Sequence, residues 1–108
     1  MRRIHYAEGS VVTGDDIADA VLEYARMLAS TATADTVEIP VRRAGGVVSA
    51  RMLLGPTSQM LVEDEADPAA EIVDEDLVAE LGARARRLDR PVPMPTDDDA
   101  SLPDPLDY

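Results

Sequence analysis

Apolar residues recur every three to four positions between residues 14 and 30, the spacing that places side chains on one side of an α-helix. Thr13 precedes this segment and Asp16 follows three residues later, which is the spacing of a capping box at a helix N-terminus. Aspartates in the first turn also suit the positive end of the helix dipole. The pattern predicts a helix over residues 14–30, with an apolar side formed by Ile17, Ala20, Val21, Tyr24 and Leu28.

The segment before this helix alternates between apolar and polar residues. Residues 2–7 have the period of a short half-buried strand, and Glu8-Gly9-Ser10 predicts a turn after it. Val11 and Val12 could extend the strand region. One strand is therefore expected before the helix.

Three more alternating segments follow the helix, at residues 37–41, 48–54 and 60–62. Ala44-Gly45-Gly46 supplies a hairpin turn between the first two. Pro40 indicates an edge strand or a bulge, because proline cannot donate a backbone hydrogen bond to a sheet. The three segments are expected to form an antiparallel meander.

A second helix is predicted after Asp74, which has the side chain of a good N-cap. Glu80 and Arg84 can pair at the i,i+4 spacing. Its apolar side is formed by Leu77, Val78, Leu81, Ala85 and Leu88. The segments together predict one small α+β domain over residues 1–90: a two-layer sandwich of an antiparallel sheet and two helices, in the order β-α-β-β-β-α.

The composition changes at Pro91. Residues 91–108 contain five of the eight prolines, five aspartates and no basic residue. Such a composition is typical of a disordered segment, because it offers little apolar surface to bury. A disordered acidic tail is therefore expected after the domain.

The residue inventory excludes many kinds of chemistry. The chain has 108 residues, a net charge of −12, no cysteine, no lysine and one histidine. Thiolate nucleophiles, Schiff-base lysines and multi-histidine metal sites therefore cannot form within one chain. The acidic charge argues against direct binding to nucleic acid or anionic membranes and favours a basic protein partner. We expect a cytoplasmic protein that is not an enzyme and needs no cofactor or metal.

Three segments contain residue types that occur in catalytic, calcium-binding or phosphate-binding sites. His5 is the only conventional acid-base residue, and catalysis would require a serine such as Ser10, Ser49 or Ser58 beside it, oriented by a carboxylate. The eight acids in residues 63–76 lack the spacing of a calcium loop and are interpreted as a solvated loop. Residues 55–58 lack the lysine of a phosphate loop and are interpreted as a turn.

Two surface groups remain as candidate interaction sites. The first is a cluster of arginines at the end of the second helix, which could receive an acidic partner or the chain's own tail. The second is the apolar end of the tail, which could order on binding. The residues are Arg84, Arg86, Arg87 and Arg90 in the cluster, and Leu106 and Tyr108 in the tail.

The chain also resembles a family of small actinobacterial proteins, a domain of unknown function that genomes often label as an ATP-dependent DNA ligase. The resemblance covers residues 2–88. The residues that carry it are Ile4-His5-Tyr6-Ala7, the helix from Asp16 to Leu28, residues 52–58 (MLLGPTS) and Asp74-Glu75-Asp76-Leu77. A ligase takes the adenylate on a lysine, which this chain does not have. The resemblance therefore implies a fold and a lineage, and no activity.

Four classes of function stay open from the sequence. The first is a non-catalytic interaction or regulatory module. The second is an acidic mimic of nucleic acid that occupies a DNA-binding protein. The third is an enzyme or an accessory factor in DNA repair, as the family label suggests, and the fourth is a protein that binds a small ligand between sheet and helices. An edge strand with few charges could also pair across the axis of a homodimer.

Overall fold

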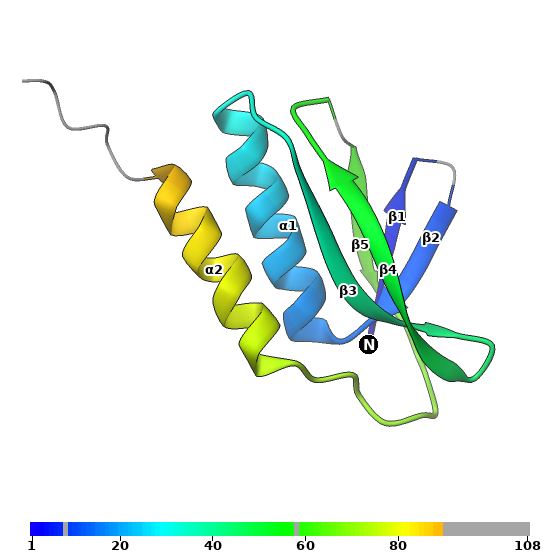
Figure 1. Cartoon of the computed structure of the whole chain (residues 1–108). Helices are drawn as coiled ribbons and strands as arrows, with labels where there is room; N and C mark the ends of the chain where they lie inside the picture. The colour runs from blue at the N-terminus through cyan, green and yellow to red at the C-terminus, as the bar shows by residue number, and fades with distance from the viewer. Residues whose placement is uncertain (8, 58, 90–108) are drawn as a thin grey trace, which may run out of the picture.

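The computed structural model describes residues 1–7, 9–57 and 59–89, which form a five-stranded antiparallel sheet with two helices on one face (Figure 1). The elements are β1 (Arg2–Tyr6), β2 (Gly9–Thr13), α1 (Asp15–Ser30), β3 (Asp35–Arg43), β4 (Gly46–Leu54), β5 (Met60–Asp64) and α2 (Glu75–Asp89). The α+β class and the antiparallel sheet with two helices are confirmed. The predicted disordered tail lies outside the described residues.

The region before α1 holds two strands, so the order of elements is β-β-α-β-β-β-α. β1 and β2 form an antiparallel hairpin in which Arg2 lies opposite Thr13 and Tyr6 lies opposite Gly9. The chain therefore reverses directly after Tyr6, earlier than the expected turn. Ala7 adopts the left-handed conformation there, with φ of 56°, which a tight reversal requires.

The expected meander is wrong in its third strand. β3 and β4 form the predicted hairpin, but β5 lies at the opposite edge of the sheet, whose order is β4-β3-β2-β1-β5. The pairing with β1 explains this position. Ile4 faces Val62 across the two strands and Arg3 faces Glu63, so apolar and oppositely charged side chains match.

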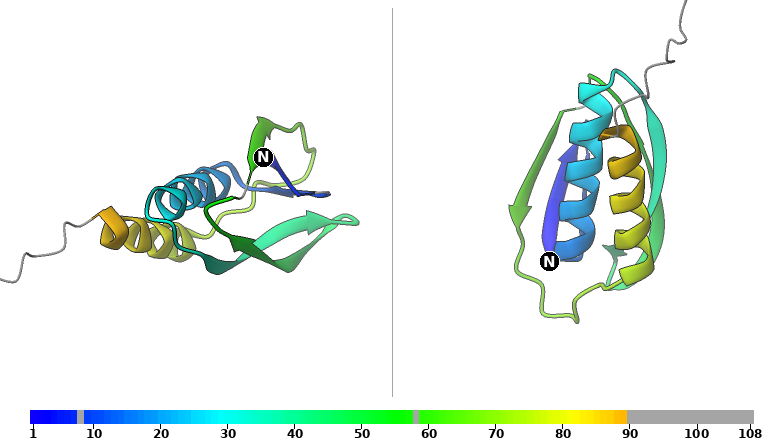
Figure 2. Two further views of the ribbon diagram at one scale, coloured as in Figure 1. Left: turned by 90° about the horizontal axis from the view of Figure 1, so that it is seen from above. Right: turned by 90° about the vertical axis from the view of Figure 1, so that its left-hand side faces the viewer.

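The sheet divides into a three-stranded part, β2-β1-β5, and the β3–β4 hairpin, which meet at one point. β2 and β3 pair only between Val12 and Arg42, and the two parts diverge elsewhere, as the view from above shows (Figure 2). Pro40 lies beside this point, where β3 needs no further hydrogen bond to β2. The proline is thus accommodated in an inner strand, although the sequence indicated an edge or a bulge.

The predicted cap of α1 is also wrong. Thr13 is fully buried at the end of β2, and its hydroxyl donates to the carbonyl of Pro40 at 2.7 Å. Gly14 occupies the N-cap position of α1, and as a glycine it has no side chain that could accept a hydrogen bond from the first turn. Another part of the chain therefore supplies the acceptor for the first turn of α1.

The core lies between the sheet and α1, and α2 packs alongside α1 (Figure 2). α2 is capped as predicted, since the Asp74 carboxylate accepts the Leu77 amide at 3.1 Å. Neither described helix is long and apolar enough to cross a membrane. The core residues from the sheet and α1 include Ile4, Ile17, Val21, Leu28, Ile39, Val41 and Leu54.

Candidate functional site

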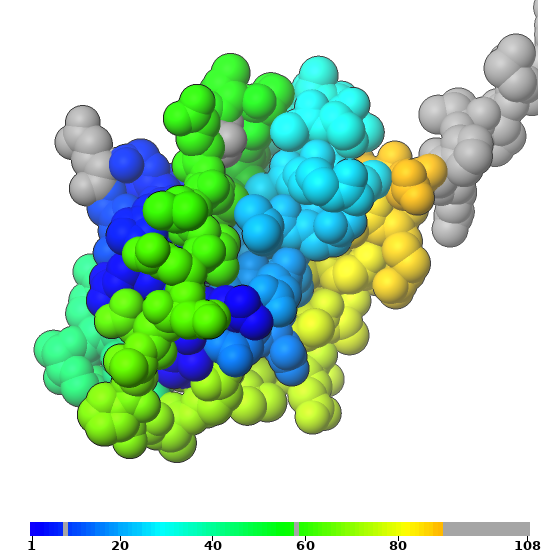
Figure 3. Space-filling model, turned by 180° about the vertical axis from the view of Figure 1, so that it is seen from behind, coloured from blue at the N-terminus to red at the C-terminus, as the bar shows by residue number. Residues whose placement is uncertain are grey.

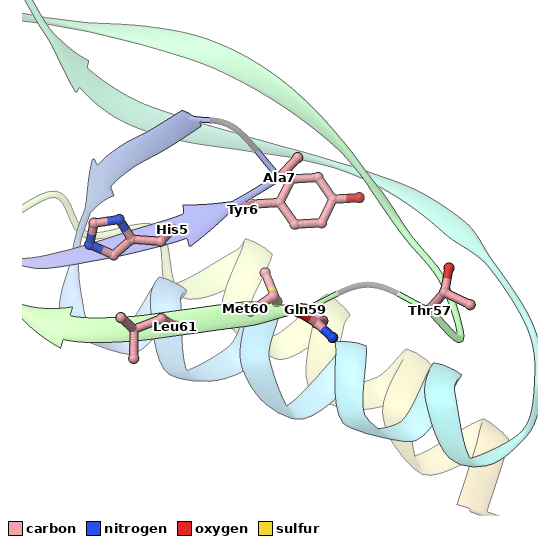
Figure 4. A pocket seen from close by; sticks show the side chains of 7 residues that line it. All are labelled: His5, Tyr6, Ala7, Thr57, Gln59, Met60 and Leu61. Carbon is pink, nitrogen blue, oxygen red and sulfur yellow. The ribbon is translucent and has the colours of Figure 1, made fainter.

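His5 lies at a hollow of about 620 Å³ where β1 ends and β5 begins (Figure 4). Its Nε2 lies 2.7 Å from Oε1 of Glu63. Tyr6 extends from the end of β1 toward the β4–β5 connection, which carries Thr57. The hollow is wide open to solvent, so it encloses no space in which a reaction could be shielded from water.

The sheet also brings a serine close to His5. Ser10 is the cross-strand neighbour of His5, so a histidine, a serine and a carboxylate share the outer face of the sheet. The Ser10 hydroxyl, however, accepts a hydrogen bond from Arg3 at 2.7 Å, and Arg3 also binds Glu65 through two nitrogens at 3.0 Å. The Arg3 guanidinium therefore lies at the Ser10 oxygen, at the position where His5 would have to accept the hydroxyl proton of a nucleophilic serine.

The two other serines do not join His5. Ser49 donates to Glu38 at 2.7 Å on the β3–β4 hairpin, and Ser58 lies outside the described residues. The geometry around His5 is therefore that of a charge-paired sheet surface. Sequence spacing did not reveal the His5–Ser10 juxtaposition, because it follows from the β1–β2 register.

The acidic run over residues 63–76 is less solvated than expected. Six of its eight carboxylates have partners, and three of the six pair with arginines of the sheet. The described residues contain no group of three or more acids or histidines that could hold a metal. The contacts of the six carboxylates are Glu63 to His5, Asp64 to Arg2, Glu65 to Arg3, Asp67 to Arg42, Glu71 to the Asp15 amide and Asp74 to the Leu77 amide. Glu75 and Asp76 begin α2.

The arginines of the predicted cluster differ in their surroundings on α2. Arg84 binds Glu80, as predicted, and also Asp35 at 3.1 Å, which ties α2 to the start of β3. Arg86 and Arg87 are exposed. Arg90, Leu106 and Tyr108 lie outside the described residues. Arg84 is therefore a structural contact, and the described part of the cluster is reduced to two residues.

Asp35 joins Arg84 to α1, because it also accepts the hydroxyl of Tyr24 at 2.6 Å. The hydrogen bond from Tyr24, with further ones from the Thr36 amide and Arg84, holds the pKa of Asp35 below its ordinary value. Burial and the same carboxylate raise the pKa of the Tyr24 hydroxyl. Both shifts favour the pair in which Asp35 is ionised and Tyr24 is neutral.

A pH dependence of stability follows from Asp35. Because its pKa is lower in the folded state, ionised Asp35 contributes stability above an unfolded-state pKa of about 3.9, and the contribution is lost as the pH falls through the folded-state pKa. We expect Asp35→Asn to be less stable than the parent at pH 7 and the difference to shrink in acid. Urea unfolding between pH 7 and acid measures this. A difference between Asp35→Asn and the parent that stays constant over this pH range would contradict the assignment.

The segment of residues 70–74 crosses from the sheet to α2 and is held at its first two positions. Figure 3 shows the chain after β5 passing around the base of the molecule toward the helices. Arg42 donates to the carbonyl of Ala70 at 2.6 Å. The Glu71 carboxylate accepts the Asp15 amide at 2.5 Å. Glu71 therefore supplies the missing cap of α1, and the amide of Asp15 keeps the pKa of Glu71 below its usual range.

The next positions are also fixed. Ile72 is buried in the core, and its carbonyl packs so closely on Gly14 that no Cβ fits there. Asp74 caps α2. Val73 faces outward, and with 68% of its surface exposed it is the most exposed large apolar residue described. The segment thus presents one apolar side chain on a backbone held on both sides.

A hollow of about 470 Å³ lies beside Val73, between the N-terminal ends of α1 and α2. Its apolar lining combines with a rim of carboxylates, two of which, Asp15 and Glu71, pair with the ammonium of Met1 at 2.9 and 3.0 Å. The apolar residues are Ile72, Val73, Val78 and Ala79, and the carboxylates are Asp15, Asp16, Glu71, Asp74 and Glu75. We call this the helix-end hollow. Its chemistry fits an apolar group carried next to positive charge.

Sequence reasoning did not single out the helix-end hollow. Its parts come from the starts of two helices and one loop, and residues 63–76 were interpreted as solvated. The exposed Val73 directly before a helix cap was the available signal. The chain matches no family model, and no curated protein or solved structure shows significant similarity to it. The resemblance to the actinobacterial family therefore stays a prediction.

Proposed function

We propose that the protein is a non-catalytic interaction module of the cytosol that binds a basic segment of another protein at the helix-end hollow. The observation that carries the proposal is Val73, exposed beside a hollow with an apolar lining and an acidic rim. An apolar side chain of the partner would enter the hollow, and its arginines or lysines would meet the exposed rim carboxylates Asp16 and Glu75. Exposed apolar surface with a polar rim is characteristic of interaction sites.

The rigidity of the segment supports the proposal. Ala70, Glu71, Ile72 and Asp74 are each held by a contact elsewhere in the fold. A surface that is already ordered loses little conformational entropy when a partner binds. Val73 is therefore presented as a preformed anchor point.

The charge distribution supports a basic partner over mimicry of nucleic acid. A mimic needs free carboxylates gathered on one face, but six of the eight acids in residues 63–76 have partners within the fold. The rim of the hollow keeps Asp16 and Glu75 exposed at the start of the two helices. Local attraction at one hollow then selects the partner, and attraction over the whole surface speeds the encounter.

The test uses two synthetic peptides with the same leucines, one with arginines and one with glutamates between them, titrated into the ¹⁵N-labelled full chain. We expect the basic peptide to shift amide signals of residues 15–16 and 71–79 and the acidic peptide to shift none. Val73→Ser should weaken binding by on the order of tenfold, because it removes an apolar anchor from the contact. Shifts confined to other residues, or no shifts at all, would overturn the proposal.

A matched control separates the anchor from general loss of apolar surface. Leu22 is also exposed, on the outer side of α1 and away from the hollow lining. Leu22→Ser should bind the basic peptide as the parent does, and both variants should unfold at nearly the parent temperature. Equal weakening by both substitutions would show that binding does not depend on Val73.

A further inference from the structure

The two edges of the sheet are protected to different degrees. β5 is five residues long and carries Glu63 and Asp64. β4 is nine residues long, carries only one charge, at Arg51, and contains no proline. It pairs with β3 at every position from Gly46 to Leu54, without a bulge. Short length, charges, prolines and bulges are the features that keep edge strands from pairing with other chains, and β4 has little of this protection.

The side chains of β4 are also exposed and apolar. Val47 is 53% exposed and Leu53 is 61% exposed, and both lie on the face of the sheet away from the helices. No described strand pairs with the outer edge of β4. In a chain with a net charge of −12, residues 39–54 contain three arginines and no acid. This edge is therefore the place where two copies of the chain would meet least acidic charge.

The order of residues in β4 is self-complementary about Ala50. If two β4 strands pair antiparallel with Ala50 opposite Ala50, Val47 of one copy lies opposite Leu53 of the other, and Ser49 lies opposite Arg51. Directly opposite residues in an antiparallel pair lie within side-chain contact. Such a match of a surface with itself is the requirement of a twofold interface.

The charge on β4 is also balanced locally. Glu38 is the cross-strand neighbour of Arg51 on β3 and accepts the Ser49 hydroxyl at 2.7 Å. In the paired arrangement, Arg51 of one copy lies opposite Ser49 of the second copy, and Glu38 of its own copy lies opposite it on β3. Each arginine thus has a carboxylate nearby, and the two arginines do not face each other directly.

We propose that the protein forms a homodimer by antiparallel pairing of β4 with β4 of a second copy, centred on Ala50. The two sheets become one continuous sheet. Because a single strand pair buries a small area, the dissociation constant is in the micromolar range, at the weak end of specific interfaces. Salt strengthens the dimer, because it screens the repulsion between two strongly acidic chains. The helix-end hollow lies next to this contact, because Val47 and Val73 line a second hollow together, but its acidic rim at Asp16 and Glu75 lies outside that second hollow.

The test is sedimentation equilibrium of the full chain from about 10 µM to about 500 µM, a range that spans micromolar dissociation constants. We expect a monomer–dimer equilibrium that shifts toward dimer at higher salt. Leu53→Glu and Val47→Lys should each weaken association by on the order of tenfold, since each places a charge opposite an apolar residue twice per dimer. A parent chain that stays monomeric throughout would overturn the proposal.

The double variant Val47→Lys/Leu53→Glu tests the register. In the pairing about Ala50, each lysine lies opposite a glutamate of the second copy, so association should return to within a few-fold of the parent. Failure of this rescue would overturn the pairing. Leu61→Lys on β5, at a residue 58% exposed, should leave association unchanged. Glu75→Gln, on the rim of the helix-end hollow and absent from the hollow that Val47 lines, should also dimerise normally, which separates this test from that of peptide binding.

Discussion

Replacement of Gly14 by alanine is expected to lower the free energy of unfolding by about 3 kcal/mol. The φ of Gly14 is −67°, which any residue can adopt, so space and not conformation requires glycine here. A Cβ at this position would overlap the carbonyl oxygen of Ile72 and lie 2.9 Å from its carbon. The segment of residues 70–74 would have to move outward. It would then lose the burial of Ile72, worth about 2 kcal/mol, and the Glu71 cap of α1, worth about 1 kcal/mol.

Urea unfolding followed by circular dichroism measures this loss. Gly9→Ala is the control, because a Cβ on Gly9 meets no atom within 4 Å, and we expect a change within about 0.5 kcal/mol. Amide shifts of residues 71–74 should move in Gly14→Ala and stay unchanged in Gly9→Ala. Equal stability of the two variants would show that residues 70–74 are not held against α1 as the structure places them.

The elements that depend on local sequence were predictable. The period of apolar residues gave α1 almost to the residue, and the Asp74 cap gave the start of α2. The β3–β4 hairpin followed from alternation on both sides of a glycine-containing turn. These patterns involve residues that are close together in the sequence, so they can be recognised from the sequence alone.

The features that depend on distant residues were not predictable in the same way. The meander assigned β5 to β4, whereas the arginines at positions 2 and 3 and the acids at 63 and 64 pair β5 with β1. Threonine is a residue type preferred at helix N-caps, but the Thr13 hydroxyl donates a buried hydrogen bond to the Pro40 carbonyl. Its place is taken by Glu71, which is far away in the sequence. Charge complementarity between the first strand and the acidic run was the signal that could have corrected both.

The two proposed surfaces would reinforce each other. The helix-end hollow lies at the start of the helices, and β4 lies at an edge of the sheet. A dimer through β4 would therefore carry two hollows, both free to bind. A partner with two basic segments could occupy both, and the second contact would form at the high effective concentration set by the first. Weak single contacts would then suffice for a stable complex, provided the spacing of the segments matches that of the hollows.

Replacement of Leu81 by alanine is expected to lower the free energy of unfolding by about 3 kcal/mol, the usual loss for a large-to-small change in a core. Leu81 is 1% exposed and, with Ala85, is one of only two buried residues of α2. The melting temperature should fall by roughly 15 °C for a domain of this size. Thermal unfolding followed by circular dichroism measures the change.

Leu77→Ala separates this anchor from the rest of α2, because Leu77 is only partly buried and its truncation should cost about 1 kcal/mol. α2 also carries Val78 and Ala79 in the lining of the helix-end hollow. Loosening the helix by Leu81→Ala should therefore weaken binding of the basic peptide, although Leu81 itself does not line the hollow. If Leu81→Ala costs no more than Leu77→Ala, then the contact between Arg84 and Asp35, and not apolar packing, holds α2 in place.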